Sequence, residues 1–120
     1  MSLGKEVIKG NTPSKSNCYK IIRIGQVASL GKTEVLKKYE ESFFWQCSLY
    51  RNANIVGAFE FVIDVFYPSK RSDLDNSLKV VLDCLQKVKA IKNDNNCAKI
   101  TAQKFIDKDN PRIEFEIIKL

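Results

Sequence analysis

The sequence predicts a small α+β domain with two principal helices and a mainly antiparallel or mixed sheet. Two stretches carry apolar residues at helical spacing, alternating stretches read as strands, and the 120 residues contain no linker, repeat or low-complexity tract. The predicted order is strand, loop, helix, strand, helix, strand, strand, which is typical of an α+β fold. We therefore expect a single domain over residues 1–120, and set residues 1–3 aside because they resemble a vector remnant.

The first quarter of the chain is expected to be largely extended. Residues 5–9 alternate like a short strand, and residues 10–17 are rich in Gly, Asn, Pro and Ser, which favour a loop. Residues 19–24 and 27–30 flank the pair Gly25-Gln26. This arrangement predicts either a hairpin or an irregular extended segment.

Two amphipathic helices follow. The first is predicted over residues 34–51, with Thr33 as its N-cap, and the second starts near residue 74. Apolar residues recur every three or four positions in both. In the first they are Leu36, Tyr39, Phe43, Cys47 and Tyr50, and in the second Leu74, Leu78, Val81, Leu82, Leu85 and Val88. On the opposite side of the second helix, Asp75, Lys79 and Asp83 form a polar ridge.

Three further strands are predicted from alternation of apolar and polar residues. They cover residues 59–67, 99–106 and about 113–117. A polar turn at 92–96 carries Asp94, and a second turn separates the last two strands.

Positive charge is concentrated near the N-terminus. The net charge is +6, and residues 1–32 carry six basic residues and one acid. A basic region beside an acidic cluster suggests a phosphate polyanion held near a metal site, whereas solubility alone is the simpler interpretation.

The composition also makes a structural zinc site improbable. There is no histidine, and Cys18, Cys47, Cys84 and Cys97 form no CxxC pair, which argues against structural zinc. We interpret the cysteines as reduced thiols of a cytoplasmic protein. No apolar run approaches the ~18 residues of a membrane span, so no membrane association is expected.

Asp73 and Asp75 are the first candidate site residues. Residues two apart lie about 200° apart around a helix, so both cannot point the same way within its interior. If Asp73 is the N-cap and Asp75 lies in the first turn, both carboxylates can converge beside the free N–H groups. With Asp94 added, the cluster would repel itself unless a divalent cation were bound.

Three carboxylates without a histidine or cysteine partner favour Mg²⁺ or Mn²⁺ over zinc or copper. Such a metal lowers the pKa of a water, orients it for attack on a phosphodiester and neutralises phosphate charge. Lys79, one turn beyond Asp75, would add a cation that stabilises the transition state.

Each of these residues also has a purely structural interpretation. Asp73 could be only a helix cap, Lys79 could only pair with neighbouring acids, and Asp94 could be an ordinary turn residue. A calcium loop starting at Asp73 is excluded, because Leu78 stands where its glycine should be and Cys84 where its bidentate glutamate should be.

The combined pattern resembles the RusA-type Holliday junction resolvases of bacteria and their prophages. It reads Asp73-x-Asp75-Asn76-x-x-Lys79-x-x-x-Asp83-x-Leu85, followed by Ile91-x-x-Asp94. The segment from Thr12 to Tyr19 is similar to that family's Pro-Ser-x-x-Asn-x-Tyr entry, and the strand order matches over nearly the whole chain.

The resemblance implies a RusA-like fold and a small homodimeric endonuclease acting in DNA recombination and repair. Such an enzyme binds four-way DNA junctions and cuts two opposed strands symmetrically with Mg²⁺ or Mn²⁺. By matching motif, Asp73, Asp75 and Asp94 would be the metal-binding catalytic acids and Lys79 the catalytic cation. Lys104 falls where the family commonly has a basic residue near the DNA.

One position departs from the family pattern. The family's turn usually reads Asp-Asp, whereas this chain has Asn93-Asp94, so the first acid is missing. The spacing from Asp75 aligns Asp94 with the second, catalytic acid.

DNA contacts are expected from two basic regions. The loop 67–72, with Lys70 and Arg71, is predicted to contact phosphates or to wedge at the crossover. Lys20 and Arg23 belong to the basic N-terminal third. Two alternatives stay open at this point: a less selective nuclease of branched DNA, and a non-catalytic nucleic-acid-binding domain.

Overall fold

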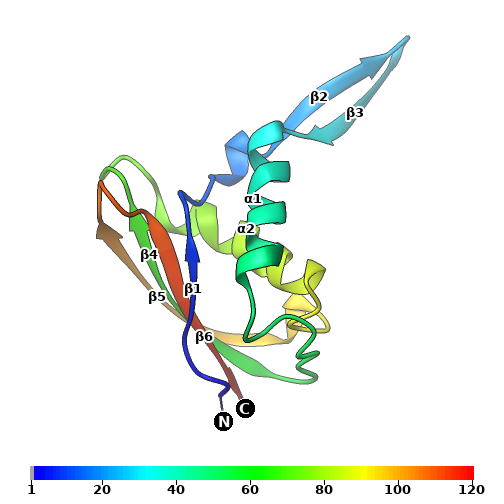
Figure 1. The fold of residues 1–120 in the computed structure, drawn as a ribbon. Helices are drawn as coiled ribbons and strands as arrows, with labels where there is room; N and C mark the ends of the chain where they lie inside the picture. Colours follow the sequence, from blue (N-terminus) through cyan, green and yellow to red (C-terminus); the bar gives the residue numbers. More distant parts are fainter. Residues whose placement is uncertain (1) are drawn as a thin grey trace.

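A four-stranded mixed sheet carries both helices on one of its faces (Figure 1). The structure is a computed structural model that describes residues 2–120, so Met1 of the suggested vector remnant lies outside the described residues. The sheet order is β1-β6-β4-β5, made by β1 (Glu6–Lys9), β6 (Arg112–Lys119), β4 (Phe59–Tyr67) and β5 (Cys97–Ile106). Only β4 and β5 run parallel, which confirms the mixed sheet of an α+β fold.

Two α-helices cover the buried face of the sheet: α1 (Glu34–Gln46) and α2 (Leu74–Lys87). The predicted N-cap of the first helix is confirmed, because the Thr33 side chain accepts a hydrogen bond from the backbone N–H of Leu36 at 3.3 Å. Alternate residues of the central strand β4 point into the core. The largest fully buried side chains of β4 are Phe59, Phe61, Ile63 and Tyr67, and those of β6 are Ile113, Phe115 and Ile117.

The predicted continuation of the first helix to residue 51 is wrong, since α1 ends at Gln46. The buried carboxylate of Glu6, in β1, accepts hydrogen bonds from the backbone N–H groups of Leu49 at 2.7 Å and Tyr50 at 3.4 Å. These amides would bond within the helix if it continued. Cys47 and Tyr50 are fully buried, as the apolar pattern indicates, but they belong to the irregular segment that follows the helix.

The buried side of α2 is broader than the predicted stripe. Leu74 and Leu78 are only partly buried, whereas Val80 and Cys84 belong to the core. The helix contacts both α1 and β5, so a larger part of its circumference is buried than if it packed against the sheet alone. The polar ridge of Asp75, Lys79 and Asp83 is exposed, as predicted.

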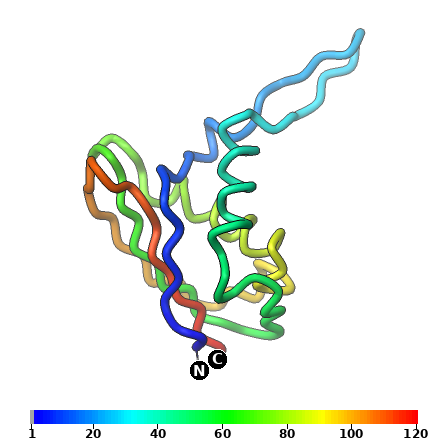
Figure 2. The backbone as a smooth tube through the Cα atoms, in the orientation of Figure 1, coloured from blue at the N-terminus to red at the C-terminus, as the bar shows by residue number. Residues whose placement is uncertain are grey.

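The strands β2 (Tyr19–Ile24) and β3 (Val27–Lys32) form a separate two-stranded sheet. This is the hairpin, not the irregular segment, of the two predicted alternatives. The hairpin projects away from the body beyond the start of α1, at the end opposite to the chain termini (Figures 1 and 2). Gly25 has φ of +63°, as the first residue of a tight two-residue hairpin loop often requires.

None of the helices within residues 2–120 has the length and apolar character needed to cross a membrane.

Candidate active site

The connection from β4 to α2 carries the first two candidate acids. Asp73 is the N-cap residue of α2, with extended φ and ψ of −93° and 130°, but its carboxylate makes no capping hydrogen bond to the helix. Within residues 2–120, the carboxylate accepts only a long bond of 3.5 Å, from Asn76 Nδ2. The side chain of Asp73 is therefore exposed and available for a role other than capping.

Tyr67, at the end of β4, fixes the start of α2. Its hydroxyl donates to Ser77 Oγ at 2.6 Å and also lies 3.2 Å from the carbonyl oxygen of Asp73. Burial raises the pKa of Tyr67, and the negative charges of Asp73 and Asp75 act in the same direction. Both carboxylates thus act on this one buried hydroxyl.

Asp75 lies in the first turn of α2. Its carboxylate accepts no hydrogen bond and forms no ion pair with any residue of the described chain 2–120. A negative charge here is favourable because the free N–H groups of the first turn carry partial positive charge. An exposed carboxylate without a protein partner can bind a cation.

Lys79 lies at the centre of the polar ridge. Its ammonium forms ion pairs with Asp94 and, at 3.0 Å, with Asp83. The hydrogen bond to Asp94, followed by the one to Asp83, raises the pKa of Lys79 above its ordinary value. Lys79 therefore keeps its positive charge throughout the neutral pH range.

Asp94 starts the short 3-10 helix η2 (Asp94–Asn96), which lies beside α2. Its backbone N–H donates to Gln86 Oε1 at 3.0 Å, a bond that the sequence pattern does not reveal. Asn93, which replaces the usual first acid, caps η2 by accepting a bond from the backbone N–H of Asn95 at 3.1 Å. Asparagine and aspartate are about equally good caps, so local structure at this turn tolerates the replacement.

The structure does not gather the three predicted metal ligands into one cluster. Within residues 2–120, no group of three or more acidic or cysteine side chains is close enough together to hold a metal ion. The expected convergence of Asp94 with the other two acids is therefore not observed, and the ammonium of Lys79 neutralises Asp94 instead.

Lys104, on β5, supports the loop that leads to the acids. Its ammonium donates to the carbonyl oxygen of Lys70 at 3.0 Å and to that of Ser72, and it lies 5.7 Å from the ring centre of Tyr67. The DNA contact of Lys104 stays a prediction. In this structure its ammonium is already hydrogen-bonded to the two loop carbonyl groups. The side chains of Lys70 and Arg71 are exposed.

The base of the β2–β3 hairpin lies next to Lys79. Lys15, Cys18 and Tyr19, at the start of the hairpin, line one small pocket together with Lys79 and Asp83. The predicted DNA-binding residues further along the hairpin, Lys20 and Arg23, are exposed. The base of the hairpin therefore belongs to the same region of the molecule as Lys79 and Asp83.

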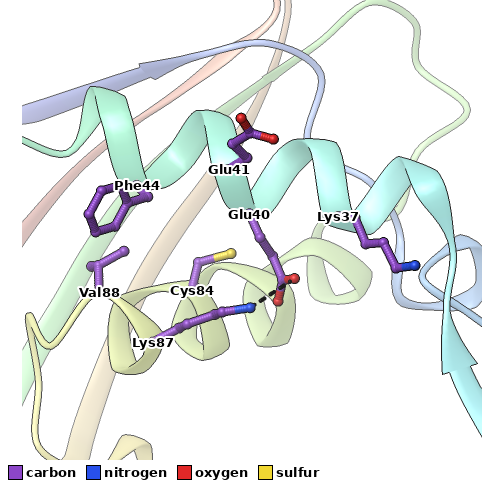
Figure 3. A pocket seen from close by; sticks show the side chains of 7 residues that line it. All are labelled: Lys37, Glu40, Glu41, Phe44, Cys84, Lys87 and Val88. Atoms are coloured by element: carbon purple, nitrogen blue, oxygen red, sulfur yellow. Dashed lines mark hydrogen bonds and ion pairs between the residues drawn. The ribbon is translucent and has the colours of Figure 1, made fainter.

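A larger pocket of about 460 Å³ lies between α1 and α2 (Figure 3). Across it, Glu40 accepts from Lys87 at 3.2 Å and also pairs with Lys32 at 3.0 Å. Burial raises the pKa of Cys84, in the pocket wall, to about 12, so this thiol is not a nucleophile near neutral pH. None of the candidate acids 73, 75 and 94 lines this pocket.

Comparison with known proteins identifies the family. The model of the family described as "Endodeoxyribonuclease RusA" matches residues 13–118. A search of curated proteins found no match. The family match includes the hairpin, the acids, Lys79 and β5, and it confirms the resemblance inferred from the motif. The chain therefore belongs to the RusA endodeoxyribonuclease family of Holliday junction resolvases, nucleases that hydrolyse DNA phosphodiester bonds.

Proposed function

We propose that this protein is a divalent-metal-dependent endonuclease that resolves four-way DNA junctions by paired symmetric nicks, in DNA recombination and repair. The observation that carries this proposal is the family match over residues 13–118. The unpartnered carboxylate of Asp75 at the exposed start of α2, one turn from the charged Lys79, gives the reaction a site.

The donor chemistry of the site fits Mg²⁺, with Mn²⁺ as a substitute. Asp73 and Asp75 offer exposed carboxylate oxygens at one helix end. Asp94, which is paired with Lys79 in this structure, would have to leave that ion pair to become the third ligand. When bound, the metal would supply an activated water and neutralise charge on the phosphate. Lys79, protonated at neutral pH, would stabilise charge on the phosphate or the departing oxygen.

The DNA would be bound by cations on both sides of the acids. Lys70 and Arg71 precede them in the chain, and Lys20 and Arg23 extend from the neighbouring hairpin. Lys104 would act mainly by holding the loop of Lys70 in place. A homodimer acting in the cytoplasm would present two identical sites to the two strands of a pseudo-symmetric junction.

The decisive experiment is cleavage of a synthetic four-way junction, with linear duplex as control, by wild type and by Asp75→Asn. The substitution removes the charge of the carboxylate and keeps its shape, so the variant should bind the junction and fail to cut it. We expect symmetric nicks from the wild type only in the presence of Mg²⁺ or Mn²⁺.

Three other outcomes would overturn all or part of this proposal. Cleavage of flaps and other branched substrates at the same rate as junctions would indicate a less selective nuclease. Binding without cleavage by the wild type, with or without metal, would indicate a non-catalytic DNA-binding domain. Equal cutting by wild type and Asp75→Asn would mean that the active site lies elsewhere.

A further inference from the structure

The β2–β3 hairpin exposes apolar side chains on both of its faces. Ile21 lies opposite Leu30 on one face, and Ile24 lies opposite Val27 on the other. Their exposed fractions are 66%, 74%, 76% and 68% in that order. A two-stranded hairpin alone is only marginally stable in water, and contiguous exposed apolar side chains mark an interaction site. Both faces are therefore expected to be covered by a partner.

The charge of the hairpin indicates the chemistry of that partner. Residues 19–32 contain Lys20, Arg23 and Lys32 and no acid. Lys32 is paired with Glu40, whereas Lys20 and Arg23 form no ion pair with the described residues 2–120. These two side chains point to opposite faces of the ribbon because they are three residues apart. Each face thus combines an apolar pair with a cation that has no ion-pair partner among residues 2–120. This combination matches DNA, which has apolar base faces and anionic phosphates.

The position of the hairpin relates it to the nuclease site. Its base lies beside Lys79, in the small pocket that Tyr19 and Asp83 also line. Strands of six residues are roughly 20 Å long, which is the length of about six base-pair steps. The tip can therefore contact DNA about half a helical turn away from a phosphate held at Lys79.

We propose that the hairpin is a wedge that inserts Ile24 and Val27 between base pairs at the branch point of a DNA junction. Apolar side chains inserted at a base step unstack and kink the duplex. A ribbon inserted between base pairs is covered on both faces, as the exposed apolar pairs on both faces of this hairpin require. This inference rests on the proposed nuclease function and assigns junction recognition to the tip of the hairpin.

The test replaces the apolar side chains of the tip with polar ones that are also branched at Cβ. Ile24→Thr with Val27→Thr keeps the branching at Cβ and the strand propensity but replaces most of the apolar tip surface with hydroxyl groups. The matched control is Val56→Thr, at an exposed valine outside the hairpin. All proteins carry Asp75→Asn so that the DNA stays intact, and the probe is a four-way junction with 2-aminopurine beside the branch point.

The unmodified hairpin and the Val56→Thr control should increase 2-aminopurine fluorescence, because the wedge unstacks the base. The tip variant should give no increase, and its preference for the junction over a matched duplex should fall by about tenfold or more. Its affinity for linear duplex should stay within about twofold. The single substitutions Ile24→Thr and Val27→Thr should each give an intermediate loss, and circular dichroism should show that all variants fold.

Four results would overturn the wedge. A tip variant with unchanged fluorescence and junction preference would show that the tip does not enter the branch point. A tip variant that loses self-association in analytical ultracentrifugation would show that a second copy of the chain covers the hairpin. Wild-type cleavage of junctions with no fluorescence change would refute the wedge and leave the nuclease function intact, whereas absence of both binding and cleavage would refute both.

Discussion

The hydroxyl of Tyr67 donates a hydrogen bond to Ser77 Oγ at 2.6 Å and so joins the end of β4 to the first turn of α2. Both side chains are about 1% exposed. The same hydroxyl also lies against the carbonyl oxygen of Asp73. The orientation of the two candidate acids at this helix end therefore depends on a buried contact with the central strand.

Tyr67→Phe should lower the free energy of unfolding by about 1–3 kcal/mol, because it removes a buried hydrogen bond and leaves the Ser77 hydroxyl without its donor. Urea unfolding measures this change as a lower midpoint with an unchanged slope. In a double-mutant cycle with Ser77→Ala, the two effects should be strongly non-additive. Full additivity would show that the hydrogen bond contributes nothing.

Asp94→Asn should lower the pKa of Lys79 toward the ordinary lysine value of about 10.4. The raised pKa comes first from the bond to Asp94, so Asp83→Asn, the matched control, should lower it less. Because the folded-state pKa is raised, the contribution of Lys79 to stability is complete at neutral pH and is lost as the pH rises through that pKa. An NMR titration of the lysine side chains measures the shift, and equal effects of the two variants would contradict the assignment.

Thiol reagents should modify Cys97 before the other three cysteines. Burial raises the pKa of Cys47 and Cys84 to about 12 and raises that of Cys18 as well, and all three side chains are inaccessible. Cys97 also has a raised pKa but is partly exposed. Mass spectrometry after brief treatment with iodoacetamide at pH 8 measures the order, with guanidinium-unfolded protein as the control. Labelling of Cys84 as fast as Cys97 would show that the helix packing opens readily.

Replacing Lys70 and Arg71 with Ala should weaken junction binding and reduce its dependence on salt. The slope of log affinity against log salt should fall by about 0.9 for each phosphate on duplex-like arms that the variant no longer neutralises. Lys5→Ala with Lys9→Ala removes the same charge at β1 and is the control. An unchanged slope in the Lys70/Arg71 variant would refute the predicted binding of phosphates by this loop.

The substitution Lys104→Met should show whether Lys104 positions the loop next to Asp73 or contacts DNA directly. The ammonium of Lys104 bonds to loop carbonyls next to Asp73, so its removal should lower the rate of cleavage more than the affinity for junctions. The salt slope should not change. A slope reduced by about one unit would instead indicate that Lys104 binds a phosphate directly.

Local signals in the sequence were sufficient for much of the fold. The Thr33 cap, the buried face of α1 and the ridge of Asp75, Lys79 and Asp83 each depend on residues within a few positions of one another. Local chemistry also placed Asp73 at the boundary of α2. Such features follow from helical periodicity and capping alone.

The features that were not predicted involve residues far apart in the chain. Glu6 ends α1 by binding amides more than forty positions away. Lys104 holds a loop that lies more than thirty positions before it. The side chain of Gln86 accepts a hydrogen bond from the backbone N–H of Asp94, and the carboxylate of Asp94 forms an ion pair with Lys79. No local pattern specifies such interactions, because they depend on how the elements pack.

The separation of the hairpin from the main sheet has a consequence for its motion. The Thr33 backbone N–H bonds to the carbonyl oxygen of Cys18 at 2.9 Å and closes the base of the hairpin. Beyond that bond, β2 and β3 pair only with each other. Opening of the hairpin breaks its own ladder and exposes no core residue, so its amides should exchange with solvent long before those of β4. Substitutions in the hairpin should therefore leave the thermal stability of the body unchanged.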